Sequence, residues 1–148
     1  MSVRTAAVAT LLLLLPLAGC TTGSAAGPSA GASPGPVKPP PAVPDELARY
    51  KYDGSRTTAV RSTTDALAGT EYALEGACTG PAEATFVVSE AGTTTIATVT
   101  VPCDGYAHLT GVGAELPDPP LQIDLNLAGV TSAWAVLAPA GAVEQVRR

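Results

Sequence analysis

The sequence predicts an all-β domain, a small antiparallel β-sandwich of six or seven strands. Three observations favour this class. Short runs rich in Val, Thr and Ala follow one another between residues 72 and 138. Turn signals built from Gly, Pro and Asp separate these runs at intervals of about ten residues. No segment in this span has the length of a crossover helix, so a parallel sheet is not expected.

The first clear strand begins at Tyr72, where apolar and acidic side chains alternate. Tyr72 and Cys78 share one face of this strand, and Glu75 lies on the other. We expect the turn signal at residues 79–81 to end the strand. Before it, residues 45–49 can begin a short N-terminal helix, with an aspartate as the N-cap.

The next strands follow in sequence order. Residues 84–89 and 93–101 are expected to form a hairpin around a tight turn at residues 90–92. A further strand covers residues 106–112. Residues 57–67 fit either a helix or a strand, because helical spacing and a Thr-rich composition compete there.

Two strands complete the predicted sheet. Residues 121–127 alternate strictly between apolar and polar side chains. Those expected to point inward are Leu121, Ile123, Leu125 and Leu127. Residues 131–138 follow, with Trp134 interpreted as a core anchor. Residues 141–148 are interpreted as an ordinary polar terminus.

Basic and acidic residues are unevenly distributed along the chain. No Lys or Arg occurs between residues 62 and 146, whereas ten acidic residues do. A span of this sign repels phosphate backbones, so we expect no nucleic-acid partner. Divalent cations and basic proteins remain electrostatically allowed.

The chain begins with a short basic segment and an apolar run that reaches Leu17. The run is too short to cross a hydrocarbon core of about 30 Å as a helix. It is typical of an export signal. The run ends in Leu17, Ala18, Gly19 and Cys20, which resemble the lipobox of bacterial lipoproteins.

The lipobox resemblance implies a location. In that class cleavage leaves the cysteine, here Cys20, as the mature N-terminus. Acyl chains on this residue then hold the protein on the extracytoplasmic face of the cell membrane, and two chains suffice for stable anchoring. The alternative is a plain signal peptide or a buried helix with an incidental cysteine.

The predicted domain organisation has three parts. Residues 1–19 are the lipoprotein signal peptide, residues 20–44 form the linker that begins with the lipid-anchored cysteine, and residues 45–148 form the β domain. The linker is dominated by Pro, Ala, Gly and Ser, so we expect it to be disordered. Fully extended, it could reach roughly 75 Å.

The three cysteines leave one unpaired if two of them bond. Lipidation of Cys20 would leave Cys78 and Cys103 for each other. Both lie near the open end of the predicted hairpin, so we expect a disulfide at its base. A zinc site that includes His108 is the alternative, but the short paired spacing of zinc ligands is absent.

The region around these cysteines also resembles a family. "GACTGPAEATFVV", "VTVPCDG" and the later "SAWAVLAP" are similar to small actinobacterial lipoproteins that share a C-x-G, hairpin, C-x-G pattern. The resemblance covers residues 72–138. It implies no activity and supplies no catalytic residue.

No motif for a catalytic nucleophile, a nucleotide, a cofactor or a metal is present. Two acidic pairs, Asp118 with Asp124 and Asp104 with Glu115, are candidates for a calcium site, although they lack the D-x-D-x-D-G spacing of a calcium loop. We therefore predict a non-catalytic module that binds a surface protein, a glycan or a small ligand. The alternatives are a glycan-active hydrolase that uses two carboxylates and an auxiliary subunit of a surface complex.

Overall fold

The structure is a computed structural model that describes residues 35–61, 63–90, 92–117 and 120–146. These residues belong to one compact unit, Ala32–Arg148. The predicted signal peptide, Cys20 and the first part of the linker lie outside the described residues.

Seven strands and one helix follow one another along the chain. They are β1 Ala48–Tyr52, β2 Thr57–Arg61, β3 Tyr72–Glu90, β4 Thr94–Asp104, β5 His108–Gly113, β6 Leu121–Leu125, β7 Ser132–Pro139 and α1 Ala140–Val146. Every strand pairing among the described residues is antiparallel. The all-β prediction is confirmed.

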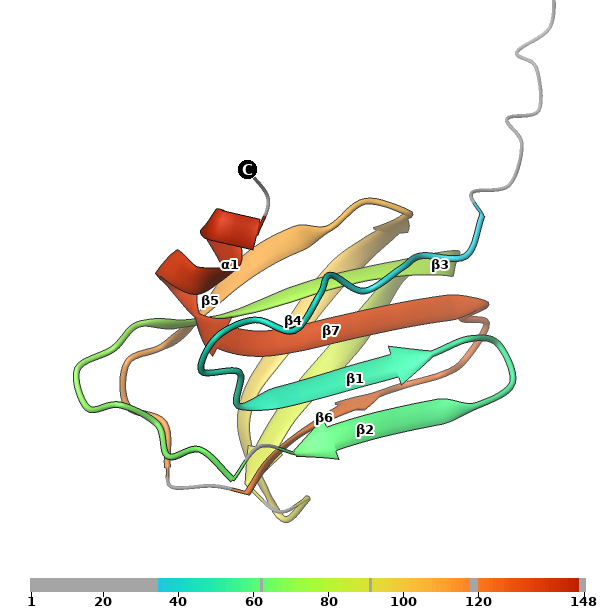
Figure 1. Cartoon of the computed structure of the whole chain (residues 1–148). Helices are drawn as coiled ribbons and strands as arrows, with labels where there is room; N and C mark the ends of the chain where they lie inside the picture. The colour runs from blue at the N-terminus through green and yellow to red at the C-terminus, as the bar shows by residue number, and fades with distance from the viewer. Residues whose placement is uncertain (1–34, 62, 91, 118–119, 147–148) are drawn as a thin grey trace, which may run out of the picture. The chain divides into compact units, whose positions relative to one another are not determined.

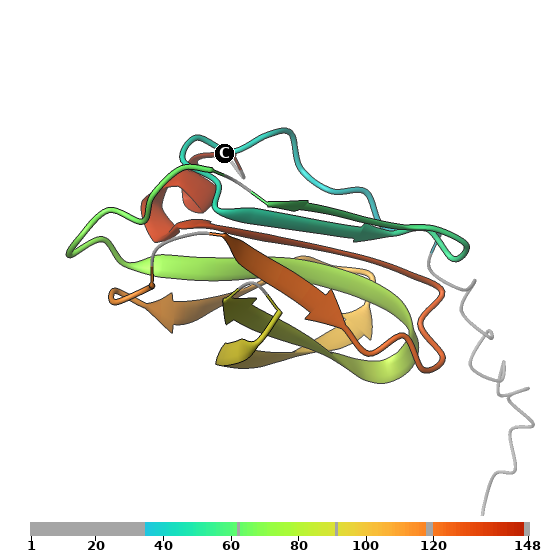
Figure 2. The same cartoon turned by 90° about the horizontal axis from the view of Figure 1, so that it is seen from below.

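β3 organises the sheet because it takes part in four of the pairings. Its first half, to Thr79, pairs with β7 on one side and β5 on the other. Its second half, from Glu83, pairs with β4 and β6. The sheet order is β2-β1-β7-β3-β4, with β5 and β6 attached to β3. Figure 2 shows β3, in yellow-green, curving so that its two halves lie in two facing layers.

The predicted turn at residues 79–81 is therefore wrong: it is a bend within one strand. The register with β4 shifts between Thr79 and Glu83, so extra residues of β3 bulge there. Gly80 permits the bend because its φ is +126°. A glycine-proline pair can bend a strand between two layers as well as reverse it, and local sequence does not distinguish the two.

The main core fills the space between the layers. Tyr72, Phe86 and Leu121 are among its fully buried side chains. The rings of Tyr50 and Phe86 meet edge to face across it, with centroids 6.4 Å apart. Burial of the aromatic rings from β1 and β3 closes one layer onto the other.

A second, smaller cluster lies on the outer face of β7 and β3. Trp134 belongs to it and is 4% exposed, as expected of an anchor. Val143 of α1 and Val43 of the N-terminal segment cover this face. Glu75 lies on the face of β3 opposite Tyr72, as predicted, and is only 3% exposed. The alternation is correct, but both faces of this half of β3 are buried.

Three local predictions are corrected. Residues 45–49 do not form a helix, because β1 begins at Ala48 and pairs with both β2 and β7. The polar terminus instead contains α1, whose first backbone N–H donates to Glu71 O (2.9 Å). β6 ends at Leu125, which leaves Leu127 in the following turn and exposed.

The described part of the predicted linker packs on the domain. Val43 is 5% exposed and Val37 packs against the second cluster. We call residues 36–43 the strap; Figure 1 shows it running across β7. This packing extends the domain beyond the boundary expected at residue 45.

Candidate binding cleft and attachment end

A cleft of about 350 Å³ lies between two loops at one end of the domain. One loop, residues 66–69, precedes β3, and the other, residues 114–116, follows β5. Because β3 and β5 pair as neighbours, Tyr72 opposite Gly113, the two loops leave the sheet side by side. We call this site the cleft.

The residues that line the cleft have mostly small or apolar side chains, and polar atoms make up about half of its surface. Its lining residues are Ala66, Leu67, Ala68, Gly69, Ala114, Glu115 and Leu116. Leu67 is 53% exposed although it is a large apolar side chain. Its backbone is held in place, because Leu67 N donates to Tyr72 Oη (2.8 Å) and Thr70 N donates to Leu67 O (3.1 Å). Hydrogen bonds therefore position the backbone at Leu67, whereas Ala66 and Leu116 are positioned by packing against the main core.

Glu115 supplies the charge in this lining. Asp65 and Glu71 flank the first loop in the sequence and are exposed. No Lys or Arg occurs between residues 62 and 146, so neither loop carries a compensating cation. The cleft combines an apolar wall with a negative field.

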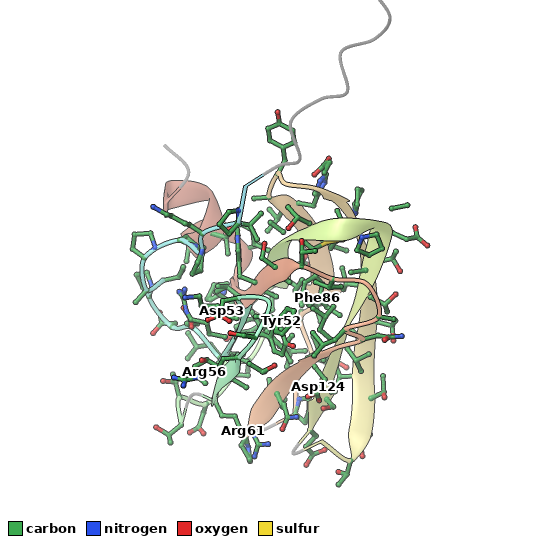
Figure 3. The ribbon with its side chains drawn as sticks, turned by 90° about the vertical axis from the view of Figure 1, so that its right-hand side faces the viewer. Tyr52, Asp53, Arg56, Arg61, Phe86 and Asp124 are labelled. Carbon is green, nitrogen blue, oxygen red and sulfur yellow. A yellow bond between two sulfur atoms is a disulfide. The ribbon has the colours of Figure 1, made fainter. Side chains whose placement is uncertain are left out.

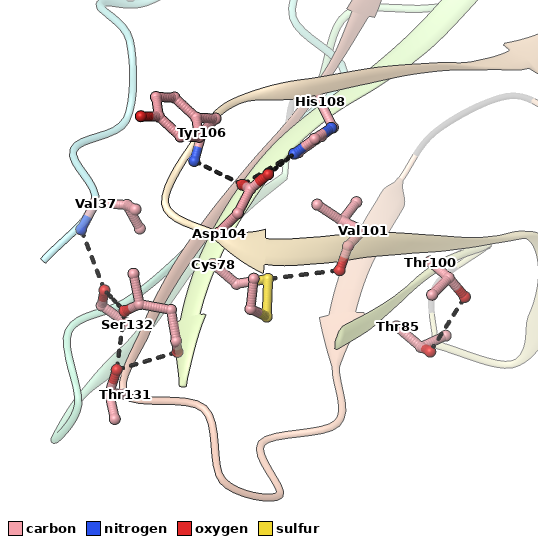
Figure 4. The surroundings of a disulfide bond; sticks show 12 residues. Val37, Cys78, Thr85, Thr100, Val101, Asp104, Tyr106, His108, Thr131 and Ser132 are labelled. Atoms are coloured by element: carbon pink, nitrogen blue, oxygen red, sulfur yellow. Dashed lines mark hydrogen bonds and ion pairs between the residues drawn. A yellow bond between two sulfur atoms is a disulfide. The ribbon is translucent and has the colours of Figure 1, made fainter. Parts of the chain in front are cut away.

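The opposite end of the domain is where the N-terminal segment enters. Val37 N donates to Ser132 Oγ (3.1 Å), and Ser132 Oγ lies 2.8 Å from Thr79 Oγ1. Thr131 N and Thr131 Oγ1 donate to Thr79 O (2.8 Å and 3.0 Å). Figure 4 shows these hydroxyls joined beneath Val37. We call this the attachment end.

The cleft and the attachment end lie at opposite ends of the β3–β7 pairing. Thr79 pairs with Ser132 at the attachment end, and Tyr72 pairs with Pro139 at the cleft end. At roughly 3.3 Å per residue, these two pairs are about 23 Å apart. The cleft therefore lies at the far end of the domain from the point where the strap begins.

The predicted disulfide is present in the structure. Cys78 and Cys103 are bonded with Cα atoms 4.4 Å apart, and both are buried. Gly105 N donates to Cys78 O (3.1 Å), which links the bond to the β4–β5 turn. The zinc alternative fails because both sulfurs are committed to each other.

His108, the single histidine of the chain, pairs with an aspartate in that turn. His108 Nε2 lies 3.0 Å from Asp104 Oδ1, which also accepts from Tyr106 N (2.9 Å). The Tyr106 N–H, and then His108, hold the pKa of Asp104 below its ordinary value. The pair caps the turn and is partly exposed to solvent.

The predicted acidic pairs do not assemble into a metal centre. Asp118 lies outside the described residues. In the ranges that the structure describes, no group of three or more His, Cys, Asp or Glu side chains could hold an ion. Asp124 instead accepts from Gln122 Nε2 (2.6 Å), and Arg61 donates to Gln122 Oε1, which joins β2 to β6. Figure 3 labels Arg61 and Asp124 at this part of the sheet.

Sequence reasoning missed the cleft and the strap. The cleft arises where two loops distant in sequence leave neighbouring strands, and no local pattern records this. One feature of the sequence could have indicated the strap. Val37 and Val43 are the larger aliphatic residues in a segment whose other residues are mostly Pro, Ala, Gly and Ser.

Comparison with known proteins found no matching family model, no significantly similar curated protein and no significantly similar solved structure. Within the described ranges, none of the helices is both long enough and apolar enough to cross a membrane.

Proposed function

We propose that this chain is a lipid-anchored cell-surface protein whose β domain binds a partner in the cleft without catalysis. The sequence at residues 17–20 supports the anchor. The Cys78–Cys103 bond supports export, because disulfides persist in oxidising compartments outside the cytoplasm. The observation that carries the binding role is the position of the cleft at the end of the domain opposite the point where the strap begins, at Val37.

The lining of the cleft favours a partner with an apolar group beside a positive charge. Leu67 and Leu116 offer apolar surface, and Glu115 offers a carboxylate. Aromatic residues are missing from the described lining, which favours a basic-apolar segment of a surface protein over a glycan. A volume of about 350 Å³ is at the lower end of ligand sites, enough for one or two side chains.

The hydrolase alternative is less well supported. Glycoside hydrolysis needs two carboxyl groups flanking the bond, and the described lining of the cleft contributes one, Glu115. Trp134 cannot serve as a sugar platform while it is 4% exposed beneath the strap. Neither observation favours catalysis at this site.

The test is site-specific photo-crosslinking in the native cell. A photoreactive amino acid replaces Leu67 in the full chain, and the matched control replaces Val60 on β2, which is 52% exposed against 53% for Leu67. We expect a discrete cross-linked partner from position 67 and not from position 60. Equal products from both positions, or none from position 67, would overturn the proposed site.

A charge reversal tests the chemistry of the partner. Glu115→Lys in the chain carrying the photoreactive residue at position 67 should lower the cross-linked yield by about three-fold or more, because the rim charge steers a basic segment. A yield that is unchanged would contradict the basic partner. A partner captured from position 60 alone would favour the auxiliary-subunit alternative instead.

A further inference from the structure

The strap is held on the outer face of β7 by specific contacts along its length. Val37 and Val43 pack into the cluster that contains Trp134 and Val136. Val37 N donates to Ser132 Oγ (3.1 Å). These contacts come from the body of the domain, whereas the strap itself has no partner strand in the sheet.

The middle of the strap is held by one arginine. Arg49 Nη1 donates to Pro40 O (2.8 Å), and Arg49 Nη2 donates to Pro41 O (2.9 Å). Glu46 orients the guanidinium from the other side by accepting from Arg49 Nε (2.8 Å) and Nη2 (2.6 Å). Both side chains are largely buried, so the fork is fixed and aimed at two successive carbonyls.

This arrangement matches the chemistry of a proline-rich segment. Prolines have no N–H to donate, so their carbonyls are the polar groups that such a segment offers. The site supplies guanidinium donors for those carbonyls and a surface containing Trp134 for the apolar groups. Recognition of extended proline-rich chains elsewhere uses aromatic surface in the same way.

We propose that the Arg49–Glu46 pair, Trp134 and Ser132 form a recognition site for proline-rich segments, and that it binds the strap of a second copy of this chain as well as its own. The contacts that the strap makes with its own domain can also be made with the domain of a second copy, because the two copies are identical. This inference does not depend on the lipid anchor or on the cleft.

The junction after the strap favours this exchange. Asp45 has φ +56°, the one positive φ among the described residues other than glycine. A residue with a side chain in this region is less stable than in an extended conformation. Opening the junction would let Asp45 return to ordinary angles, and strained junctions of this kind promote exchange of a terminal segment.

The test uses a cysteine pair placed across the strap contact. Val37→Cys with Ser132→Cys is made in the full chain with Cys20→Ser, and Val37→Cys alone in the same background is the control. After mild oxidation with diamide over a concentration series, non-reducing gels separate bonds within a chain from bonds between chains. We expect the dimer fraction to rise with concentration, to about five-fold or more above the control.

A bond within the chain at every concentration, with dimers no more frequent than in the control, would overturn the proposal. Ser132→Cys also removes a hydroxyl, so folding is checked by the emission of Trp134, the single tryptophan of the chain. A second measurement needs no substitution. Sedimentation of the unmodified chain should show a dimer, and excess synthetic peptide GPVKPPPAVP should lower its fraction. A monomer at all concentrations would also overturn it.

Discussion

Gly80 has no room for a side chain. A Cβ there would lie 2.3 Å from Gly129 O and 2.9 Å from Thr131 N, and φ is +126°. We expect Gly80→Ala to lower the free energy of unfolding by at least about 2 kcal/mol, because the bend of β3 and the backbone of residues 129–131 must move apart. Denaturant unfolding measures this.

Gly111 on β5 is the matched control for that substitution. A Cβ at this position meets no atom within 4 Å and its φ is not positive, so Gly111→Ala should leave stability within about 0.5 kcal/mol. If the two substitutions lower the free energy of unfolding equally, the close backbone approach at Gly80 is not the cause of the loss.

Asp53 predicts a pH dependence of stability. Its carboxylate accepts from Arg56 N (2.9 Å), Ser55 N (3.1 Å) and Ser55 Oγ (2.9 Å), and these bonds, that from Arg56 first, hold its pKa below 3.8. A lowered pKa stabilises the folded state above the unfolded value, and this contribution is lost as pH falls through the folded pKa.

Asp53→Asn keeps an acceptor oxygen but removes the charge. We expect the unsubstituted chain to be the more stable at pH 7 and the gap to close as pH falls below about 4. Thermal unfolding of both chains between pH 7 and pH 2 measures it. A gap that stays constant or widens in acid would contradict the assignment to the carboxylate.

At the scale of elements, the disulfide joins the bend of β3 to the end of β4. It closes a sequence separation of 25 residues. Cys78→Ala with Cys103→Ala should cost roughly 3 kcal/mol in free energy of unfolding in the chain-entropy description. Denaturant unfolding of the double variant measures this cost. A loss under about 1 kcal/mol would mean that the core holds β3 and β4 in register without the bond.

The strands could be predicted from the sequence where one face of the strand is buried and the other is not, because apolar and polar side chains then alternate. Leu121 and Ile123 are buried as the alternation in β6 predicts. β1 was not predictable, because its ladder with β7 brings together residues far apart in sequence and overrides a local helix signal. The cleft was invisible for a related reason: its two loops meet through the β3–β5 pairing.

At the scale of the molecule, the strap shortens the predicted tether. Because residues 36–43 pack on the domain, the chain between Cys20 and Gly35 can span at most about 50 Å, less than a linker that ends at residue 44. If Cys20 carries the proposed lipid anchor, this shorter tether holds the domain closer to the membrane than a linker of residues 20–44 would.

The central claim is that this domain is displayed from a membrane by its N-terminus. Intact mass spectrometry of the chain purified from membranes tests it most directly. We predict a mature chain that begins at Cys20, carries a diacylglyceryl group there, and contains one disulfide between Cys78 and Cys103. A mature chain that begins elsewhere, or an unmodified thiol at Cys20, would contradict the claim.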